Sequence, residues 1–341
     1  MTAVNDTPTA LNWLRNQVGR IRPKPSNPLN PKKTGLSPEP VAPPAPSVAI
    51  VTDSAAALPP EWIGEIADSG VLTVVPIPVI IGENVYSDDD AELEVHISLA
   101  LASGKPIKTS RPSPGQFERA YKAAADAGFA QIVSLHLSKK LSGTLEAAQL
   151  AADRSPIPVH VVDSATVGMG QGRGVQAAVE SSLRGDDAPA VIAAATTAFA
   201  ATAVYFYVPS LEQLRRGGRI SLASSWFGTV LDIKPILGIK DGAIVPLEKV
   251  RTAAKAIARL QALAAADITA RGAAGTRISL HHFGNADQAR ALGRALEAGA
   301  PGLADATLTR LPAVLAAHAG LGVLVVVVSD AVVPPQPDPE L

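Results

Sequence analysis

The sequence predicts an α/β fold with two domains, and three observations lead to this prediction. The chain has 341 residues, which at roughly 150 residues per domain corresponds to about two domains. From residue 47 onward, short β-branched runs alternate with Ala-rich stretches long enough to form helices, as in sheets flanked by helices. Several of these runs are continuous and apolar, which is typical of strands covered on both faces.

Nine segments are expected to form strands, and each is a run of β-branched or aliphatic residues bounded by polar or turn residues. They span Val48–Thr52, Val71–Ile81, Gln131–Leu137, Val159–Val162, Val204–Val208, Ile244–Val250, Arg277–Phe283, Ala306–Leu311 and Leu321–Ser329. The longest aliphatic run, from Leu321 to Val328, is much shorter than the roughly 20 residues of a membrane span. It therefore predicts a buried strand.

The clearest helix start is the sequence Ser113-Pro114-Gly115-Gln116. Ser at the N-cap, Pro at the first helical position and Gln three residues after the cap form a capping-box pattern. The helix is expected to run to Gly128, and the segment before Ser113 is consequently expected to be a strand-to-helix loop.

The first 46 residues differ in composition from the rest. They contain ten of the 29 prolines and six basic residues against two acidic ones, which predicts a basic, Pro-rich, disordered tail. Within it, Ala10–Ile21 has apolar residues at helical spacing, typical of a short helix that docks on a partner or a membrane surface, unless the tail has no specific partner. Two α/β domains are expected over residues 47–185 and 186–331, followed by a Pro-rich tail over 332–341.

Composition also excludes several classes of function. The 30 Lys and Arg residues balance 31 Asp and Glu residues, so the basic footprint of a nucleic-acid-binding protein is absent. There are no cysteines, which excludes disulfides, thiolate nucleophiles and cysteine zinc sites, and favours a reducing cytoplasm. Charges and prolines occupy the first thirty residues, so no export signal is expected.

The polar residues that directly follow predicted strands are the candidates for a ligand site, because open α/β sheets bind ligands at the carboxyl ends of their strands. Four loops qualify, at Asp53-Ser54, residues 108–113, residues 137–144 and Asp163-Ser164. They are rich in hydroxyls and poor in paired acids and bases. Hydroxyls beside helix N-termini suit a carboxylate or a phosphate, whereas the alternative is that they are ordinary N-caps.

A glycine-rich run at residues 168–174 does not match a dinucleotide-binding motif, since its glycines recur every second residue. It predicts close backbone packing instead. Two glycines at 217 and 218 end a predicted helix and place Arg219 on a turn, where it either clamps a carboxylate or forms a surface salt bridge. The six histidines show no metal-ligand spacing, and His318, which precedes the last apolar strand, is either a site residue or a buried structural histidine.

Taken together, the loops resemble the DegV family of fatty-acid-binding proteins, some of which are the lipid-carrying subunit of bacterial fatty acid kinase. The matching segments occur in the family's order across residues 47–331: Val51-Thr52-Asp53-Ser54, Tyr86-Ser87-Asp88, Thr109-Ser110-Arg111-Pro112-Ser113-Pro114-Gly115-Gln116-Phe117, Leu141-Ser142-Gly143-Thr144, Val162-Asp163-Ser164, Gly217-Gly218-Arg219-Ile220-Ser221, Ile233-Lys234-Pro235-Ile236-Leu237 and His318-Ala319-Gly320-Leu321-Gly322. Each segment is weak alone, but the ordered set is specific.

The resemblance implies a two-domain DegV-like fold, with a Rossmann-like parallel-sheet N-terminal domain and a second α/β domain with a mixed sheet. It implies that Thr109 and Ser142 donate hydroxyl hydrogen bonds to a fatty-acid carboxylate, and that Arg219 and His318 line the head-group site as positively charged or polar groups. The supporting loop residues are Asp53, Ser54, Ser110, Gly143, Thr144, Asp163 and Ser164. Ala319 and Leu321 depart from the family's usual His-[Ser/Thr]-Gly-Pro-Gly pattern, so the surroundings of His318 are the part that a structure has to test.

The function expected from the resemblance is that of a cytoplasmic protein, not itself an enzyme, that binds a long-chain fatty acid in a buried tunnel. It would present the carboxylate to a partner kinase that makes an acyl phosphate. No nucleotide motif, metal site or other cofactor is expected, nor nucleic-acid binding or a transmembrane segment, although transient contact with a membrane surface fits the tail. The alternative is a serine-dependent hydrolase of small molecules that uses Ser142 as nucleophile and a histidine such as His318 as base.

Overall fold

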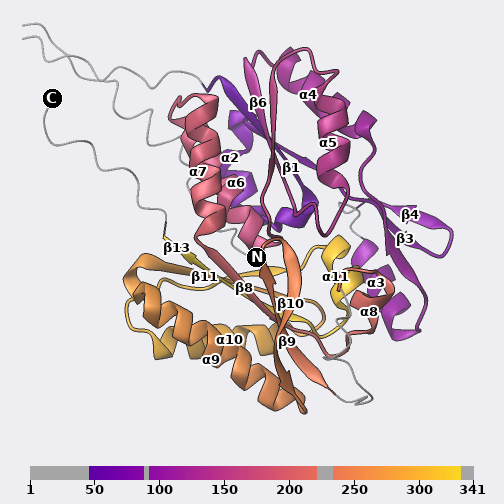
Figure 1. Cartoon of the computed structure of the whole chain (residues 1–341), viewed down its shortest axis with the longest axis vertical. Helices are drawn as coiled ribbons and strands as arrows, with labels where there is room; N and C mark the ends of the chain where they lie inside the picture. Colours follow the sequence, from indigo (N-terminus) through magenta and orange to yellow (C-terminus); the bar gives the residue numbers. More distant parts are fainter. Residues whose placement is uncertain (1–45, 88–91, 221–232, 332–341) are drawn as a thin grey trace, which may run out of the picture. The chain divides into compact units, whose positions relative to one another are not determined.

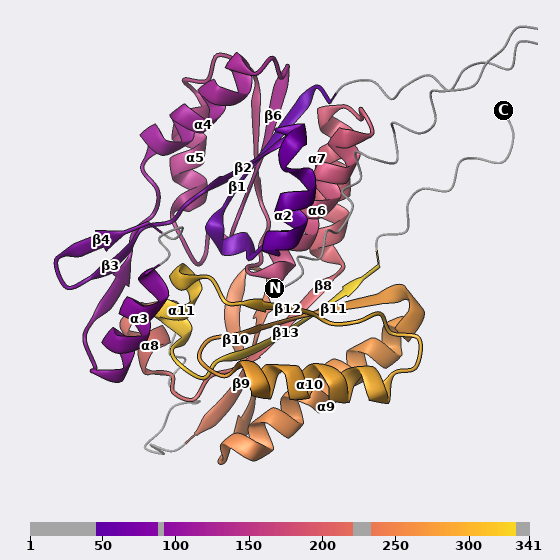
Figure 2. The same ribbon diagram turned by 180° about the vertical axis from the view of Figure 1, so that it is seen from behind.

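The computed structural model describes residues 46–87, 92–220 and 233–331, all within one compact unit. Both predicted tails, the helix expected at Ala10–Ile21, and Asp88 and Ser221 of the matching segments lie outside the described residues. The described part is mixed α/β with three sheets (Figures 1 and 2). No described helix is both long enough and apolar enough to cross a bilayer.

The first sheet has four strands in the order β2-β1-β6-β7, and all its pairings are parallel. The strands are β1 (Val48–Asp53), β2 (Leu72–Val75), β6 (Gln131–His136) and β7 (Val159–Asp163). Helices α4 (Pro114–Asp126) and α5 (Thr144–Ala152) cover one face, and α6 (Met169–Leu183) and α7 (Ala188–Ala200) cover the other (Figure 1). Both faces are covered, which explains the continuous apolar runs and confirms the predicted parallel sheet.

The second sheet is mixed and has six strands in the order β10-β9-β8-β13-β11-β12, of which only β11 and β12 pair in parallel. The strands are β8 (Thr202–Tyr207), β9 (Lys234–Lys240), β10 (Ala243–Val250), β11 (Thr276–His282), β12 (Thr307–Arg310) and β13 (Leu324–Asp330). Helices α9 (Ala253–Arg271) and α10 (Ala286–Gly299) pack on one face. The opposite face contributes to a separate core together with α11 (Ala313–Ala319).

A third, small sheet was not predicted. It contains β3 (Val79–Ile81), β4 (Asn84–Tyr86) and β5 (Ile107–Thr109) in the order β4-β3-β5. The prediction of a single strand over Val71–Ile81 is wrong, because this segment forms β2 and β3 in different sheets. Pro76 and Pro78 lie between them, and proline cannot donate a ladder hydrogen bond, so the strand is interrupted there.

The remaining helices are short, apart from α3. They are α2 (Pro60–Ile66), α3 (Leu93–Ala102) and α8 (Glu212–Arg216), with 3₁₀ turns at Ser54–Ala56, Ala67–Ser69 and Ala273–Gly275.

Two local predictions are confirmed. Helix α4 begins after the Ser113 N-cap, whose backbone N–H donates to Gln116 Oε1 at 2.9 Å, and it ends at Asp126, two residues earlier than expected. The glycine-rich run lies at close backbone contacts, as shown by Gly174, where a Cβ would lie 2.0 Å from a ring carbon of Phe199 in α7. The predicted boundary at residue 185 falls between α6 and α7, which pack against each other, and it stays a prediction.

Candidate functional site

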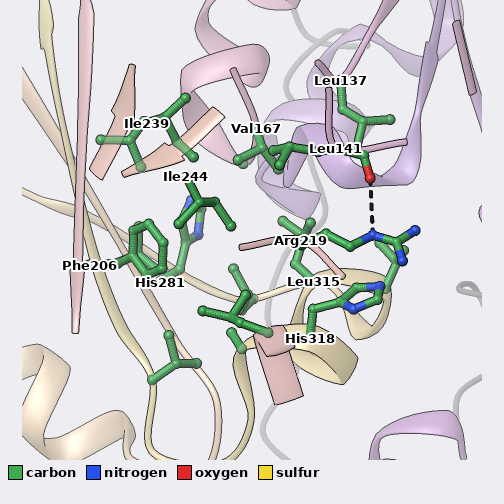
Figure 3. A pocket seen from close by; sticks show the side chains of 18 of the residues that line it. Leu137, Leu141, Val167, Phe206, Arg219, Ile239, Ile244, His281, Leu315 and His318 are labelled. Carbon is green, nitrogen blue, oxygen red and sulfur yellow. Dashed lines mark hydrogen bonds between the residues drawn. The ribbon is translucent and has the colours of Figure 1, made fainter. Parts of the chain in front are cut away.

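Thr109, Ser142, Arg219 and His318, the four residues assigned to a head-group site, line the same cavity. They come from four separate parts of the chain, at the end of β5, the loop before α5, the turn after α8 and the last turn of α11. The cavity holds about 800 Å³ of space not filled by protein atoms, a volume that includes its open mouth. Figure 3 shows this pocket from close by.

The second sheet provides the apolar floor of the cavity through alternate residues of its strands. In one cross-strand row, Ile244 lies opposite Ile239 in the β10–β9 pair. In the next row, Val325 lies opposite both Phe206 and His281. All five side chains line the cavity. The period of two along each strand sends the intervening residues to the other face, against α9 and α10.

The polar groups of the cavity begin with a hydrogen bond between Thr109 and His318. Thr109 Oγ1 lies 2.8 Å from His318 Nε2. Burial, with the nearby charge of Arg219, lowers the pKa of His318 to about 4, so this imidazole is neutral near pH 7. Of the two characters expected for His318, positively charged or polar, the structure supports the polar one.

Arg219 is held beside His318 by the turn that the two glycines form. Gly218 has a φ of +68°, which favours glycine, and a Cβ on Gly217 would lie 2.4 Å from His318 Nδ1. The guanidinium donates from Nε to the Leu141 carbonyl at 3.1 Å (Figure 3). It also donates from Nη1 to the Gly217 carbonyl. Burial lowers its pKa from the usual value. Its two hydrogen bonds in the described structure go to neutral carbonyls, which leaves its charge available to an anion.

Ser142 lies directly before helix α5, whose N-cap is Gly143. Its Oγ is 2.9 Å from Thr144 Oγ1, and Thr144 is fully buried. A helix N-terminus of this length favours negative charge nearby, because its first N–H groups have no partner within the helix. The hydroxyl of Ser142, the start of α5 and the guanidinium of Arg219 thus all favour an anionic group in this cavity.

Asp53, at the end of β1, begins a buried series of hydrogen bonds that stabilises the loop before Ser142. Its Oδ2 accepts from the Leu137 backbone N–H at 3.1 Å and lies 2.9 Å from His136 Nδ1. His136 Nε2 bonds Ser134 Oγ at 2.7 Å, which in turn lies 2.9 Å from the hydroxyl of Tyr121. Burial raises the pKa of Tyr121 to about 12. All four polar side chains are fully buried. Their hydrogen bonds therefore fix the end of β6, where the loop with Ser142 begins.

The other predicted loop residues do not line the cavity, and four of them bond other parts of the backbone. Ser54 Oγ accepts from the Ile77 N–H at 3.1 Å, and Ser110 Oγ donates to the Arg111 carbonyl at 3.1 Å. Asp163 Oδ1 accepts from the Ala165 N–H at 2.9 Å, and Ser164 Oγ from the Thr166 N–H at 3.3 Å. The Ser54 contact joins residues 23 apart in the sequence, whereas the other three are local contacts of turns, which is the alternative expected for such loops.

His281 is a residue of the cavity that sequence reasoning missed. Its Nε2 accepts from the backbone N–H of Met169 at 3.1 Å, so the proton is on Nδ1, which donates to Thr309 Oγ1 at 2.7 Å. Burial lowers its pKa to about 3. This neutral imidazole joins the start of α6 to β11 and β12 across the cavity wall. Within the described residues, no three His, Asp or Glu side chains are grouped so as to hold a metal ion.

Comparison with known proteins fixes the family. The family model described as an uncharacterised protein of the DegV family matches residues 47–331. The chain belongs to the DegV family. A DegV domain-containing protein of Streptomyces coelicolor is 43% identical over 283 residues, which cover 83% of this chain and 98% of that protein.

Two solved DegV structures give the same result for the fold. A DegV family protein from Thermus thermophilus, whose structure is described by its fatty acid binding, is 32% identical, with a TM-score of 0.75 over 84% of this chain and all of that chain. DegV from Bacillus subtilis, described as a fatty acid binding protein, is 27% identical, with a TM-score of 0.74 over 84% of this chain and 99% of that one. The predicted DegV-like α/β fold is thereby confirmed.

Proposed function

We propose that this DegV protein binds a long-chain fatty acid, with the acyl chain in the apolar cavity and the carboxylate at Thr109, Ser142, Arg219 and His318. The observation that carries the proposal is the distribution of polarity around the cavity. A floor of aliphatic and aromatic side chains meets hydroxyls, a helix N-terminus and one guanidinium. A fatty acid has the same distribution, with one charged group on a long apolar chain.

The energetics of such a complex are favourable. Burial of a methylene contributes about 0.8 kcal/mol, so about 14 methylenes contribute about 11 kcal/mol before the cost of association. A dry, unpaired carboxylate would cost several kcal/mol. The hydroxyls of Thr109 and Ser142 and the guanidinium of Arg219 offset this cost through hydrogen bonds to a charged acceptor. The relatives from Thermus thermophilus and Bacillus subtilis, described by their fatty acid binding, support the assignment.

We further propose that the bound carboxylate is the substrate of a partner kinase. In that reaction a carboxylate oxygen attacks the γ-phosphorus of ATP, so that an acyl phosphate and ADP form. The chain has no phosphate-binding loop with a lysine, and the partner would therefore supply the nucleotide and its Mg²⁺. On this proposal the DegV protein acts in the cytoplasm as a carrier without a cofactor or catalytic activity of its own, and its ligands do not include nucleic acid.

The alternative of a serine hydrolase is less well supported by the hydrogen bonds of the site. A nucleophilic serine needs a base within hydrogen-bonding reach. In the described structure Ser142 bonds Thr144, and His318 Nε2 bonds Thr109 instead. The pKa of His318 is also lowered to about 4, which makes it a weak base.

The test compares Ser142→Ala with Ser110→Ala, a nearby serine outside the cavity. Titration with palmitate should show a weaker Kd for Ser142→Ala by about 10- to 150-fold, as expected for a lost hydrogen bond to a charged group, and an unchanged Kd for Ser110→Ala. Hydrolysis of a p-nitrophenyl ester should be absent from the unmodified protein. Ester turnover that Ser142→Ala abolishes, without any binding of palmitate, would establish the hydrolase instead.

The kinase step is tested separately with the palmitate-loaded protein, ATP and Mg²⁺. Acyl phosphate, trapped as the hydroxamate, should form only after a fatty acid kinase catalytic subunit is added. Formation of ADP and acyl phosphate without that subunit would contradict the carrier role.

A further inference from the structure

The hairpin of β9 and β10 forms a wall of the cavity on the side away from Arg219 and His318. Ile239 and Ile244 are directly opposite each other in its ladder, and both line the cavity. Figure 3 shows them across the pocket from the two head-group residues. Strand β10 is at the edge of its sheet, so among the described residues no further strand lies beside Ile244 that could fill the space its side chain occupies.

The position of this hairpin is fixed at its tip. Asp241 and Gly242, the two turn residues, have φ angles of +49° and +78°, the pattern of a type I′ turn with its usual Asp-Gly sequence. The Gly242 carbonyl accepts a hydrogen bond from the fully buried Ser138 hydroxyl at 2.7 Å. A Cβ on Gly242 would lie 2.4 Å from Ser138 Oγ. The tip is therefore pinned to the loop after β6 and does not move outward without the loss of this contact.

We infer that Ile244, with Ile239 beside it, sets the upper limit of acyl length that the cavity accepts. The inference rests on the proposed function, since it names the subclass of fatty acid that the same site selects. A chain that exceeds the space up to these two side chains has to displace a pinned hairpin. Shorter chains leave part of the apolar wall uncovered and lose about fourfold in affinity per missing methylene.

The variant that tests the inference is Ile244→Ala, which removes three carbons from the wall and makes room for about two more methylenes at about fourfold in affinity each. Its matched control is Leu247→Ala on the same strand. Leu247 is partly exposed, packs against Gly238 and does not line the cavity. Both changes remove the same number of carbons from the same hairpin, so an effect on overall hairpin stability is common to both.

The experiment measures Kd for saturated fatty acids of 14 to 20 carbons by displacement of cis-parinaric acid, with thermal unfolding to confirm that each variant is folded. The preferred chain should become about two carbons longer in Ile244→Ala, with the Kd ratio between the old and new optimum shifted by about 4- to 16-fold. The profile of Leu247→Ala should match that of the unmodified protein. Ile244→Phe, which fills the wall, should shift the preference to shorter chains.

Two failures are distinguishable. If the unmodified protein binds fatty acids and both Ile244 variants keep its length profile, the inference is overturned while the proposed function stands. If neither the unmodified protein nor Leu247→Ala binds any fatty acid of the series, the proposed function fails, and the inference fails with it.

Discussion

Gly217 is the position where the smallest substitution is expected to disturb the head-group site most. In Gly217→Ala the new Cβ would lie 2.4 Å from Nδ1 and 3.0 Å from Cε1 of His318. Ordinary contacts of a Cβ begin near 3.4 Å, so the imidazole or the turn has to shift by about 1 Å. The Thr109–His318 hydrogen bond is 2.8 Å long, and a shift of that size takes it beyond the usual limit of a hydrogen bond.

The loss of one hydrogen bond to a charged ligand group corresponds to about 1.5–3 kcal/mol, or about 10- to 150-fold in Kd. The assay is calorimetric titration with palmitate, combined with urea unfolding. Gly218→Ala is the matched control, because no atom of the described residues lies within 4 Å of the added Cβ. Because Gly218 has a φ of +68°, its replacement by Ala should cost about 1–2 kcal/mol of stability. The Kd for palmitate should change by less than about threefold.

The two substitutions are therefore expected to differ in effect: Gly217→Ala weakens palmitate binding, and Gly218→Ala lowers stability. A Gly217→Ala protein that binds palmitate as tightly as the unmodified protein would refute the assignment of His318 to the head-group site. Equal losses of palmitate affinity in both variants would instead show that binding depends on the conformation of the turn and not on the contact between residue 217 and His318.

Three further predictions concern stability. The pKa values of His318 and His281 in the folded protein are about 4 and 3, below the usual 6.5 of the unfolded chain. The unfolded chain therefore binds these protons more readily, so the stability that the two neutral imidazoles contribute is fully present above pH 6.5 and is lost as the pH falls. For each histidine the free energy of unfolding should fall by about 3 kcal/mol between pH 7 and pH 4. Urea unfolding at the two pH values measures this loss, and equal stability at both would contradict both pKa shifts. Tyr121→Phe breaks the buried bond to Ser134 and should lower the free energy of unfolding by about 1–2 kcal/mol, measured with urea. Palmitate affinity should be unchanged, because Asp53 still holds the Leu137 N–H; a weaker Kd would show that the bond to Ser134 is also needed to position the loop with Ser142. Ser138→Ala removes the hydroxyl that donates to the Gly242 carbonyl at the hairpin tip and should lower the free energy of unfolding by about 1–3 kcal/mol. An unchanged midpoint of urea unfolding would show that this hydrogen bond does not hold the tip in place.

Much of the fold was predictable because local sequence and simple topology determine it, whereas four cavity residues were predicted from the resemblance to the DegV family. Parallel strands bring their carboxyl ends to one edge of a sheet, so the loop after β6 had to be near the loop after β1. The contact between Leu137 N–H and Asp53 confirms this proximity. The ordered set of loop motifs then singled out Thr109 and Ser142 together with Arg219 and His318, and the structure brings all four to one cavity. Their roles toward a carboxylate stay predictions.

The parts that sequence did not reveal depend on contacts between distant residues. His281 bonds Met169, 112 residues away, and Thr309, 28 residues away, and no spacing rule connects these positions. Strand β9 (Lys234–Lys240) was not predicted, because its Pro235 and Gly238 are unfavourable in strands. It forms since Ile236 and Leu237 bury fully on opposite faces of the sheet, a tertiary effect that outweighs local propensity.

The central claim is that the cavity holds a fatty acid. The most direct test is native mass spectrometry of the protein purified without added lipid, compared with its denatured mass and followed by identification of the extracted small molecules. The account predicts a mass difference equal to one long-chain fatty acid per protein, and recovery of that acid in the extract. A protein that is empty as purified and also fails to take up added palmitate or oleate would contradict it.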